Sequence, residues 1–246
     1  MENILKIKKE LNLYEQFEST AICYHFFDQA LAKFTNNPEI KIRQVVDHEE
    51  LIQLSDARKR MYGQRDEYFK RFYENDLYID QKDLDSYLFA CFYKGEIVGI
   101  QRISHTPFEI ENYLDNETLE GYLGQNYKDR YVEFSKLLVD KEVRIPNLAN
   151  ALGVIGGTLV AIVTGKDNYV TYSKPHLKRK NLDLDVDNVT FKIPSRNNDD
   201  YQLFKGTMSK DIQRLFSIPG ENKDAIIGNL LGFIHRSQQA TEAGVA

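Results

Sequence analysis

The stretch YVEFSKLLVD, residues 131–140, decides the fold that we expect of this chain. Its aromatic and aliphatic residues favour an extended strand. Because side chains alternate between the two faces of a strand, Glu133 and Ser135 should share one face, and Lys136 should point to the other. We therefore expect a central strand that carries a carboxylate and a hydroxyl on the same side.

The charge inside that strand needs an explanation. Burying an unpaired carboxylate is costly, so Glu133 should be paired, hydrogen-bonded or retained for chemistry. The alternative is an edge strand with Glu133 in solvent. Arg102 raises the same question in the run IVGIQRIS, residues 97–104. Its guanidinium needs a carboxylate, and Glu133, Asp83, Asp85 and a substrate all remain open, in a structural ion pair or in a binding role.

The composition narrows the classes of function. With 246 residues, of which 42% are hydrophobic, the chain can form one globular unit with additions. The net charge of -5 argues against a nucleic-acid binder, which needs a basic surface. Cys23 and Cys91 fit neither a disulfide framework nor a metal site, so we expect a reducing cytoplasm and no metal. The charged N-terminus lacks the apolar core of a signal peptide.

One apolar run, residues 148–165, has the minimum length of a membrane span. It contains 18 residues without a charge. Asn150, Thr158, Thr164 and four glycines dilute its hydrophobicity, and no aromatic belt flanks it. We expect a helix buried on all sides in the core and no transmembrane segment.

The order of the expected elements predicts an α/β domain of the α+β kind. Asp47 can cap a helix over 48–62, and two strands over 87–93 and 97–104 should form an antiparallel hairpin. The other expected elements are helices in 1–36, a strand over 40–46, short helices up to 126, the strand over 131–140, a helix over 148–165, strands over 169–172, 189–193 and 201–207, and helices over 174–180 and 225–234. This order predicts a mixed, mostly antiparallel twisted sheet flanked by helices. The expected division is a helical extension over 1–38, a core over 39–208, and a helical appendage with a disordered tail over 209–246.

Several motifs carry a family resemblance. VEFSKLLVD resembles the W-E-L-S-R-F-x-V segment of the acyl-homoserine-lactone (autoinducer) synthases and of the related N-acyl amino acid synthases, which belong to the GNAT superfamily. Further similar segments follow the same order along residues 40–190. They are Arg58, Tyr62 and Arg65 in the pattern R-x-x-x-F/Y with a following arginine, the aspartates Asp80 and Asp83 with Asp85 as a rival, GIQRISHT with Arg102 and Thr106, and SKPHLKRKNL over 173–182.

The resemblance implies a GNAT-type fold that transfers a fatty acyl chain from a phosphopantetheine thioester to a primary amine. Glu133 would act as the general base, and backbone N–H groups over 137–139 would stabilise the oxyanion. Ser135 would polarise the carbonyl or hold a water. The residues expected to bind substrate are Arg58, Tyr62, Arg65, Asp80, Asp83, Arg102, Thr106 and Lys136. His105 and Tyr172 are further candidates for an acid or base.

The expected donor is an acyl carrier protein rather than coenzyme A, and no bound cofactor is expected. Coenzyme A users of this superfamily carry Q/R-x-x-G-x-G/A before the long helix, where backbone N–H groups hold the pyrophosphate. Residues 143–151, VRIPNLANA, lack those glycines. An acidic carrier protein could dock on a local basic patch, although a solvated helix end explains the same charges. The patch consists of Lys174, Lys178, Arg179 and Lys180.

The expected acceptor is an amino acid or a similar small amine, and the acylated product could be delivered to a membrane. Autoinducer synthases that use S-adenosylmethionine carry a tryptophan after the first helix and an arginine after the motif serine, whereas this chain has no tryptophan and has Lys136. The alternatives are such an autoinducer synthase, a non-catalytic module that binds acyl chains or carrier protein, and an enzyme that acylates a protein lysine or a biosynthetic intermediate.

Overall fold

The computed structural model describes residues 8–16, 20–64, 77–175 and 189–215, with Gly228 and Gly232. Some expectations fall on other parts of the chain. Arg65, the basic residues Lys178, Arg179 and Lys180, and almost all of the helix expected over 225–234 lie outside the described residues.

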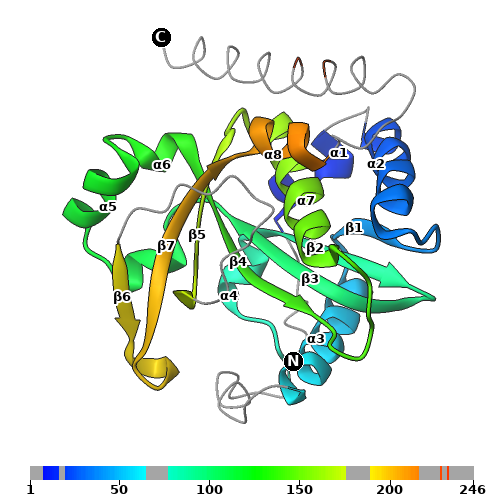
Figure 1. Ribbon diagram of the computed structural model, residues 1–246, viewed down its shortest axis with the longest axis horizontal. Coiled ribbons are helices and arrows are strands. Elements are labelled where there is room, and N and C mark those ends of the chain that lie inside the picture. Colours follow the sequence, from blue (N-terminus) through cyan, green and yellow to red (C-terminus); the bar gives the residue numbers. More distant parts are fainter. Residues whose placement is uncertain are drawn as a thin grey trace. The chain divides into compact units, whose positions relative to one another are not determined.

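Seven strands form one mixed sheet in the order β1-β2-β3-β4-β5-β7-β6 (Figure 1). The strands are β1 (Lys41–Val45), β2 (Ser86–Tyr93), β3 (Glu96–Ser104), β4 (Tyr131–Val139), β5 (Asn168–Ser173), β6 (Thr190–Ile193) and β7 (Asp199–Thr207). The pairs β1/β2, β5/β7 and β6/β7 are antiparallel, and β4/β5 is parallel. The expectation of a mixed, mostly antiparallel sheet with helices is therefore confirmed.

The helices of the described residues lie between these strands and at both ends of the described part of the chain. They are η1 (Lys9–Leu11), α1 (Leu13–Gln16), α2 (Thr20–Thr35), α3 (His48–Gly63), α4 (Gln81–Leu84), η3 (Glu109–Asn112), α5 (Asn116–Leu123), α6 (Tyr127–Arg130), α7 (Leu148–Thr164), η5 (Pro194–Arg196) and α8 (Met208–Leu215).

The chain forms two compact units, and each consists of two separate segments. Unit 1 contains Met1–Ile103 and Lys136–Leu159, and unit 2 contains Ser104–Ser135 and Val160–Ala246. The boundary falls inside β4, so this strand contributes residues to both units. The expected three-part division at residues 38 and 208 stays a prediction.

A capping box begins α3, and its first residue, Asp47, is the helix cap that the sequence predicts. The Asp47 side chain accepts a hydrogen bond from the Glu50 N–H at 2.8 Å, and the Glu50 carboxylate accepts one from the Asp47 N–H at 3.5 Å and another from the Val46 N–H at 2.9 Å. These bonds satisfy backbone donors that a helix start otherwise leaves unpaired. The helix therefore begins directly after β1.

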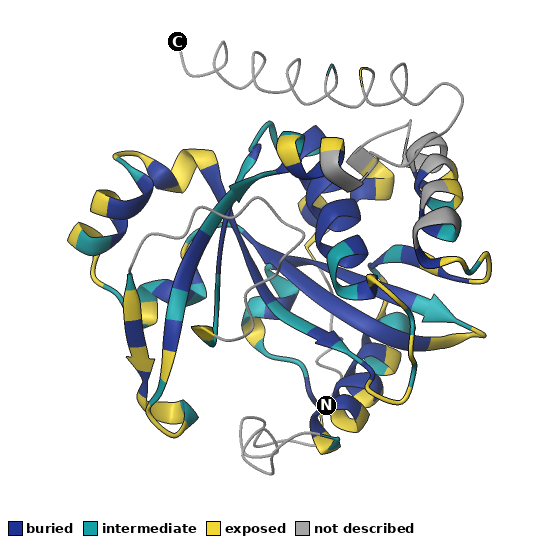
Figure 2. Ribbon diagram, viewed as in Figure 1, coloured by how far each residue is buried: buried dark blue, intermediate teal, exposed yellow. Residues whose placement is uncertain are grey.

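In unit 1, α7 packs closely on the strands because two glycines remove side-chain bulk. A Cβ atom on Gly99 of β3 would lie 2.7 Å from Leu152 Cδ1, and one on Gly156 of α7 would lie 2.8 Å from Phe89 Cδ2. Residues 151–162 of α7 are all buried, which confirms the expected buried helix, and much of α7 is dark blue in Figure 2. Within the described ranges, no helix is long and apolar enough to span a bilayer.

Unit 2 has its own hydrophobic cluster, built from η3, α5, α6 and strands β4 to β7, with Phe108, Ile110 and Phe191 among its members. Helix α8, which the sequence did not predict as a separate element, is tied to β5. The buried Asp211 carboxylate accepts a hydrogen bond from the Tyr169 hydroxyl at 2.6 Å.

Candidate active site

Strand β4 carries candidate residues of both units. Glu133 belongs to the part of β4 in unit 2, and Lys136 belongs to the part in unit 1. Glu133 is completely buried, and β4 lies between β3 and β5 in the sheet. The alternative of an edge strand with a solvated Glu133 is therefore wrong.

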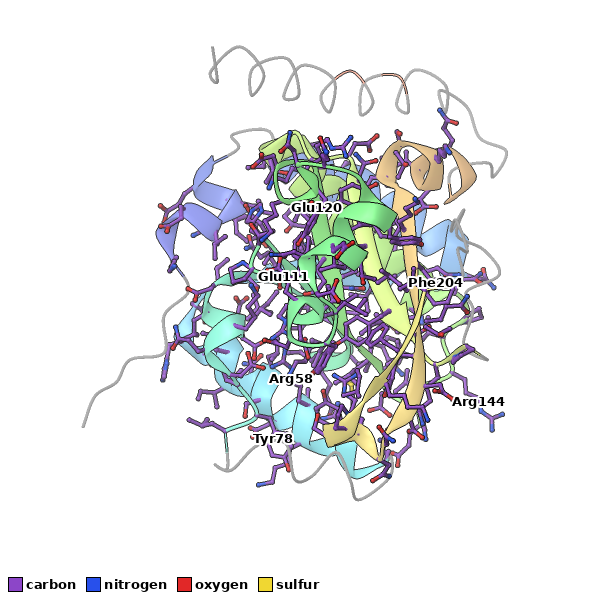
Figure 3. The ribbon with its side chains drawn as sticks, turned by 90° about the vertical axis from the view of Figure 1, so that its left-hand side faces the viewer. Arg58, Tyr78, Glu111, Glu120, Arg144 and Phe204 are labelled. Atoms are coloured by element: carbon purple, nitrogen blue, oxygen red, sulfur yellow. The ribbon has the colours of Figure 1, made fainter. Side chains whose placement is uncertain are left out.

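In unit 1, Arg58 and Asp83 form a buried ion pair. Arg58 Nη1 lies 2.6 Å from Asp83 Oδ2, and Arg58 Nη2 lies 2.9 Å from Asp83 Oδ1. Arg58 Nη1 also donates to the carbonyl oxygen of Tyr78 at 2.9 Å, and Figure 3 labels both residues. This geometry uses the planar fork of arginine, which lysine could not reproduce.

The remaining charged residues of unit 1 join this pair into a network. Arg102 Nη1 lies 3.0 Å from Asp80 Oδ1 and 3.3 Å from Asp83 Oδ1. Lys136 Nζ lies 2.8 Å from Asp80 Oδ2. Arg102 thus pairs with Asp80 and Asp83, whereas Asp85, the rival in the motif, lies 2.9 Å from Lys8 Nζ.

The charges around Asp83 change its titration. Burial alone would raise the pKa of this carboxyl, but the charge and hydrogen bonds of Arg58, followed by the charges of Arg102 and Lys136, outweigh burial and lower the pKa below its ordinary value of 3.8. Asp83 is therefore an anion at neutral pH, and its charge is committed to the network.

Asp80 is the most accessible acid of the network. Its side chain caps α4 by accepting from the Asp83 N–H at 2.9 Å. About a third of the side chain is exposed, compared with none of Asp83 and 14% of Lys136. Tyr62, another expected substrate residue, is buried and stacks on Tyr78 with 6.2 Å between ring centroids.

In unit 2, backbone donors hold the Glu133 carboxylate. Its Oε2 accepts from the Glu109 N–H at 2.7 Å, and its Oε1 accepts from the Ile110 N–H at 2.9 Å. These N–H groups belong to the first turn of η3, where Phe108 stands at the N-cap position and offers no capping side chain. Glu133 therefore supplies from β4 the cap that η3 lacks, and the two N–H groups stabilise its negative charge.

An arginine and aromatic rings lie next to η3. Arg196 Nη2 is 3.3 Å from Glu109 Oε1 and 3.4 Å from the Tyr172 hydroxyl. Burial raises the pKa of Tyr172 well above 10, and the negative charges of Glu109 and Glu133 raise it further against the opposing charge of Arg196. Tyr172 is therefore a neutral hydroxyl group at physiological pH. Sequence reasoning missed Glu109 and Arg196, since neither lies in a motif.

The backbone of β4 has an unusual conformation at Lys136, three residues after Glu133. The parallel pairing with β5 covers Tyr131–Phe134, and the Thr171 hydroxyl then donates to the Phe134 carbonyl at 2.9 Å. Lys136 has φ +51°, in the left-handed region that disfavours residues with a Cβ. The regular extended backbone expected through residues 131–140 is therefore interrupted at Lys136.

The other expected site residues lie in different settings. Ser135 is buried two residues after Glu133, and His105 and Thr106 are half-buried ahead of η3. Lys174 forms an exposed salt bridge with Asp199 at 2.7 Å. Within the described ranges, no group of His, Cys, Asp and Glu side chains could hold a metal ion.

The segment before α7 forms no glycine-rich loop. It reaches α7 through Asn147, which has φ +60°, and its Arg144 is exposed (Figure 3). Residues 143–151, VRIPNLANA, contain no glycine.

Comparison with known proteins identifies the fold. No family model matches the sequence, and neither does any curated protein. Among solved structures, FeeM, an N-acyl amino acid synthase from uncultured soil microbes, is similar with a TM-score of 0.50 and 14% identity, over 71% of this chain and 94% of FeeM. The AHL synthase LasI is similar with a TM-score of 0.51 and 16% identity, over 74% of this chain and 96% of LasI.

A third solved structure agrees with these two. The CoA-dependent acyl-homoserine lactone synthase BjaI is similar with a TM-score of 0.51 and 11% identity, over 77% of this chain and 91% of BjaI. The structural match to the GNAT fold expected from the sequence is thereby confirmed.

Proposed function

We propose that this protein is an N-acyltransferase that moves a fatty acyl chain from an acyl carrier protein thioester to the amine of an amino acid or a similar small amine. The observation that carries the proposal is the position of Glu133. Its buried carboxylate is held by two backbone N–H groups, one residue before the β4/β5 pairing ends. The GNAT-like fold is similar to those of an N-acyl amino acid synthase and two acyl-homoserine lactone synthases, which supports acyl transfer as the reaction class.

In the proposed reaction the amine must be neutral when it attacks the thioester carbonyl. Glu133, directly or through a water, accepts the proton that the amine gives up, while the C–N bond forms. The C–S bond then breaks, and the phosphopantetheine leaves as a thiol after taking up a proton. A carboxylate has about four acceptor positions, so holding by two N–H groups is compatible with a base role. Backbone N–H groups over 137–139 are proposed to stabilise the oxyanion, with Ser135 beside the carbonyl.

The network in unit 1 is proposed to bind the acceptor. Arg58 and Asp83 are buried and bound to each other, which supports a scaffold role for this pair. Asp80 and Lys136 are more exposed, and we propose that they contact the acceptor together with Arg102. A lysine at position 136 can present a point charge but not the bidentate fork of arginine, which favours a small amine over S-adenosylmethionine.

A carrier protein is the proposed donor. The absence of a glycine-rich segment over 143–151 supports this choice, because a carrier protein presents its pantetheine arm without the free pyrophosphate of coenzyme A. Lys174, Lys178, Arg179 and Lys180 are proposed to dock the carrier protein, whose acidic surface they would complement.

The proposal can be tested with purified protein, acylated carrier proteins of several chain lengths and a mixture of amino acids and other amines. Thiol release and mass spectrometry should detect new N-acyl products. With S-adenosylmethionine as the sole amine, no lactone should form. E133Q should lower kcat by roughly 100-fold or more, since one acid–base group contributes about that factor. An active E133Q would overturn the base assignment, and the absence of thiol release from every donor would overturn the enzyme assignment.

A further inference from the structure

Two backbone N–H groups of the short helix η3 hold the carboxylate of the proposed base, Glu133. In the same helix, the carboxylate of Glu109 pairs with Arg196, which lies 87 residues later in the chain. We infer that Arg196 and Glu109 are positioning residues for Glu133. Their ion pair fixes the first turn of η3, and the backbone N–H groups of that turn fix the Glu133 carboxylate. The catalytic consequence rests on the proposed function, whereas the structural coupling stands independently of it.

The first step is the orientation of the carboxylate. A glutamate side chain has three rotatable bonds, so its carboxylate needs external contacts to keep one position. Both oxygens of Glu133 bind neighbouring N–H groups, Glu109 at 2.7 Å and Ile110 at 2.9 Å. Any shift of η3 must therefore move or release the carboxylate.

The second step is the weakness of η3 itself. This helix has only four residues, which is too short to be stable without tertiary contacts. The Phe108 N–H donates to Glu111 Oε1 at 3.1 Å, and Ile110 is buried in the hydrophobic cluster. Glu109 itself points to Arg196 at 3.3 Å. Glu109 therefore connects the two elements, because its N–H holds Glu133 and its carboxylate contacts Arg196.

The third step is what fixes Arg196. Its guanidinium lies over the rings of Tyr172 and Tyr201, at 5.5 Å and 5.4 Å from their centroids. Burial alone would lower the pKa of Arg196, but the charge of the neighbouring Glu109 carboxylate raises it, so the group stays charged. Its side chain is only 19% exposed. The cation therefore sits in a partly desolvated aromatic setting, where contacts with rings are stronger than on an open surface.

The fourth step is charge balance. Without Arg196, the carboxylate of Glu109 would lose a cation that lies 3.3 Å from it, in a partly desolvated place where charges interact more strongly than in water. Loss of Arg196 should thus loosen η3 through Glu109. Replacing Glu109 by glutamine in the same chain should remove most of that penalty.

The experiment compares R196Q, E109Q and the double variant E109Q/R196Q with the wild type. Amide hydrogen–deuterium exchange at Glu109 and Ile110 reports the position of η3 without any assay of activity. Kinetics then separate kcat from the KM of each substrate. We expect R196Q to accelerate both exchange rates and to lower kcat by about 10- to 100-fold with KM within about twofold, since small displacements of reacting groups cost this much. R196K should recover part of kcat.

The double variant and a matched control decide the mechanism. E109Q/R196Q should be more active than R196Q, because the carboxylate charge that Arg196 balances is also gone. K205Q is the matched control, because it removes another cation of unit 2. Lys205 lies 4.4 Å from the Tyr122 ring centroid and donates to the Tyr122 carbonyl. K205Q should leave kcat and the amide exchange rates of Glu109 and Ile110 unchanged. If R196Q does not fold, E109Q alone tests the coupling, because it removes the same ion pair from the other side.

The inference is overturned if R196Q and E109Q leave exchange at Glu109 and Ile110 unchanged, if the two kcat effects simply multiply in the double variant, or if K205Q gives the same loss. A wild type without activity on any donor and amine would count against the proposed function instead, and the exchange rates would still decide the coupling.

Discussion

Arg58 and Asp83 form a two-pronged ion pair, at 2.6 Å and 2.9 Å, from which solvent is excluded on both sides. D83N would remove the carboxylate and leave the Arg58 charge buried without it. We expect the free energy of unfolding at pH 7 to fall by about 3–5 kcal/mol, measured by chemical denaturation. D199N removes the exposed bridge to Lys174 and should cost less than about 1 kcal/mol. Equal losses in the two variants would contradict the prediction.

The same carboxyl makes stability depend on pH. The pKa of Asp83 is lowered from 3.8 by Arg58, Arg102 and Lys136 against the opposing effect of burial, so its unfolded form takes up a proton first as the pH falls. Its contribution is fully present above about pH 4 and is lost as the pH drops through the folded pKa. The unfolding free energy of wild type should decline more steeply below pH 4 than that of D83N. If the unfolding free energies of wild type and D83N fell in parallel below pH 4, Asp83 would not be the source of this pH dependence.

Lys136 allows a test of backbone strain. With φ +51°, this residue occupies the left-handed region, which glycine adopts without cost and other residues adopt at about 1 kcal/mol or more. Both K136G and K136A lose the ion pair with Asp80, but only K136G relieves the backbone. K136G should therefore be the more stable of the two in denaturation. At the exposed Lys192 of β6 the order should be reversed, with K192A more stable than K192G.

Gly206 allows a test of packing around Tyr169. A Cβ at this position would meet the Tyr169 ring, whose Cε1 would lie 2.8 Å away. The ring cannot easily move, since it stacks on Phe134 at 4.5 Å and its hydroxyl bonds Asp211 at 2.6 Å. G206A should destabilise the protein by about 1–3 kcal/mol.

Gly121 in α5 provides the control for this variant. A Cβ there meets nothing within 4 Å, and alanine favours a helix. G121A should therefore leave the melting temperature unchanged or raise it. A loss in G121A as large as that in G206A would rule out the steric explanation.

Cys91 should be chemically inert in the folded protein. Burial raises the pKa of its thiol to about 12, so almost none of it is thiolate at pH 8, and the thiolate is the reactive form. In a C23S variant, which leaves Cys91 as the sole cysteine, a thiol reagent at pH 8 should react only upon unfolding. Labelling at the rate of a free thiol in buffer without denaturant would show that the residue is accessible.

Charge reversal tests carrier-protein docking. K178E/R179E should raise the KM for acyl carrier protein by roughly tenfold with little change in kcat, and added salt should diminish the difference because salt screens exposed charges. K128E changes an exposed lysine of α6 outside the patch and should leave this KM unaltered. An unchanged KM in K178E/R179E would remove the patch from the docking surface.

Much of the fold could be predicted because its signals are local. Asp47 and Glu50 have the spacing of a capping box, and α3 begins there. Lys94 and Gly95 join β2 to β3 with φ +52° and +82°, as a tight hairpin requires. Helix α8 lacked such a signal, because its place depends on Asp211 bonding Tyr169, which lies 42 residues earlier in the chain.

The candidate site could be predicted only where side chains carry the chemistry. The motif spacing singled out Asp80, Asp83 and Arg102, which the structure brings together. The hydrogen-bond partners of Glu133, the N–H groups of Glu109 and Ile110, could not be predicted, because backbone N–H groups have no signature in a sequence. Arg196 was equally hidden, since it meets Glu109 across 87 residues. The left-handed turn at Lys136 was missed because no glycine marks it.

The division of the chain within β4 has a consequence for protein synthesis. Strand β3 is complete at Ser104, but its neighbour in unit 1 begins only with Lys136. At about 5–20 residues per second, a ribosome needs roughly two to six seconds to make the intervening chain. During that interval one edge of β3 has no partner, and such edges invite pairing with other nascent chains. Until this part of β4 has been synthesised, that edge of β3 is therefore open to pairing with other chains.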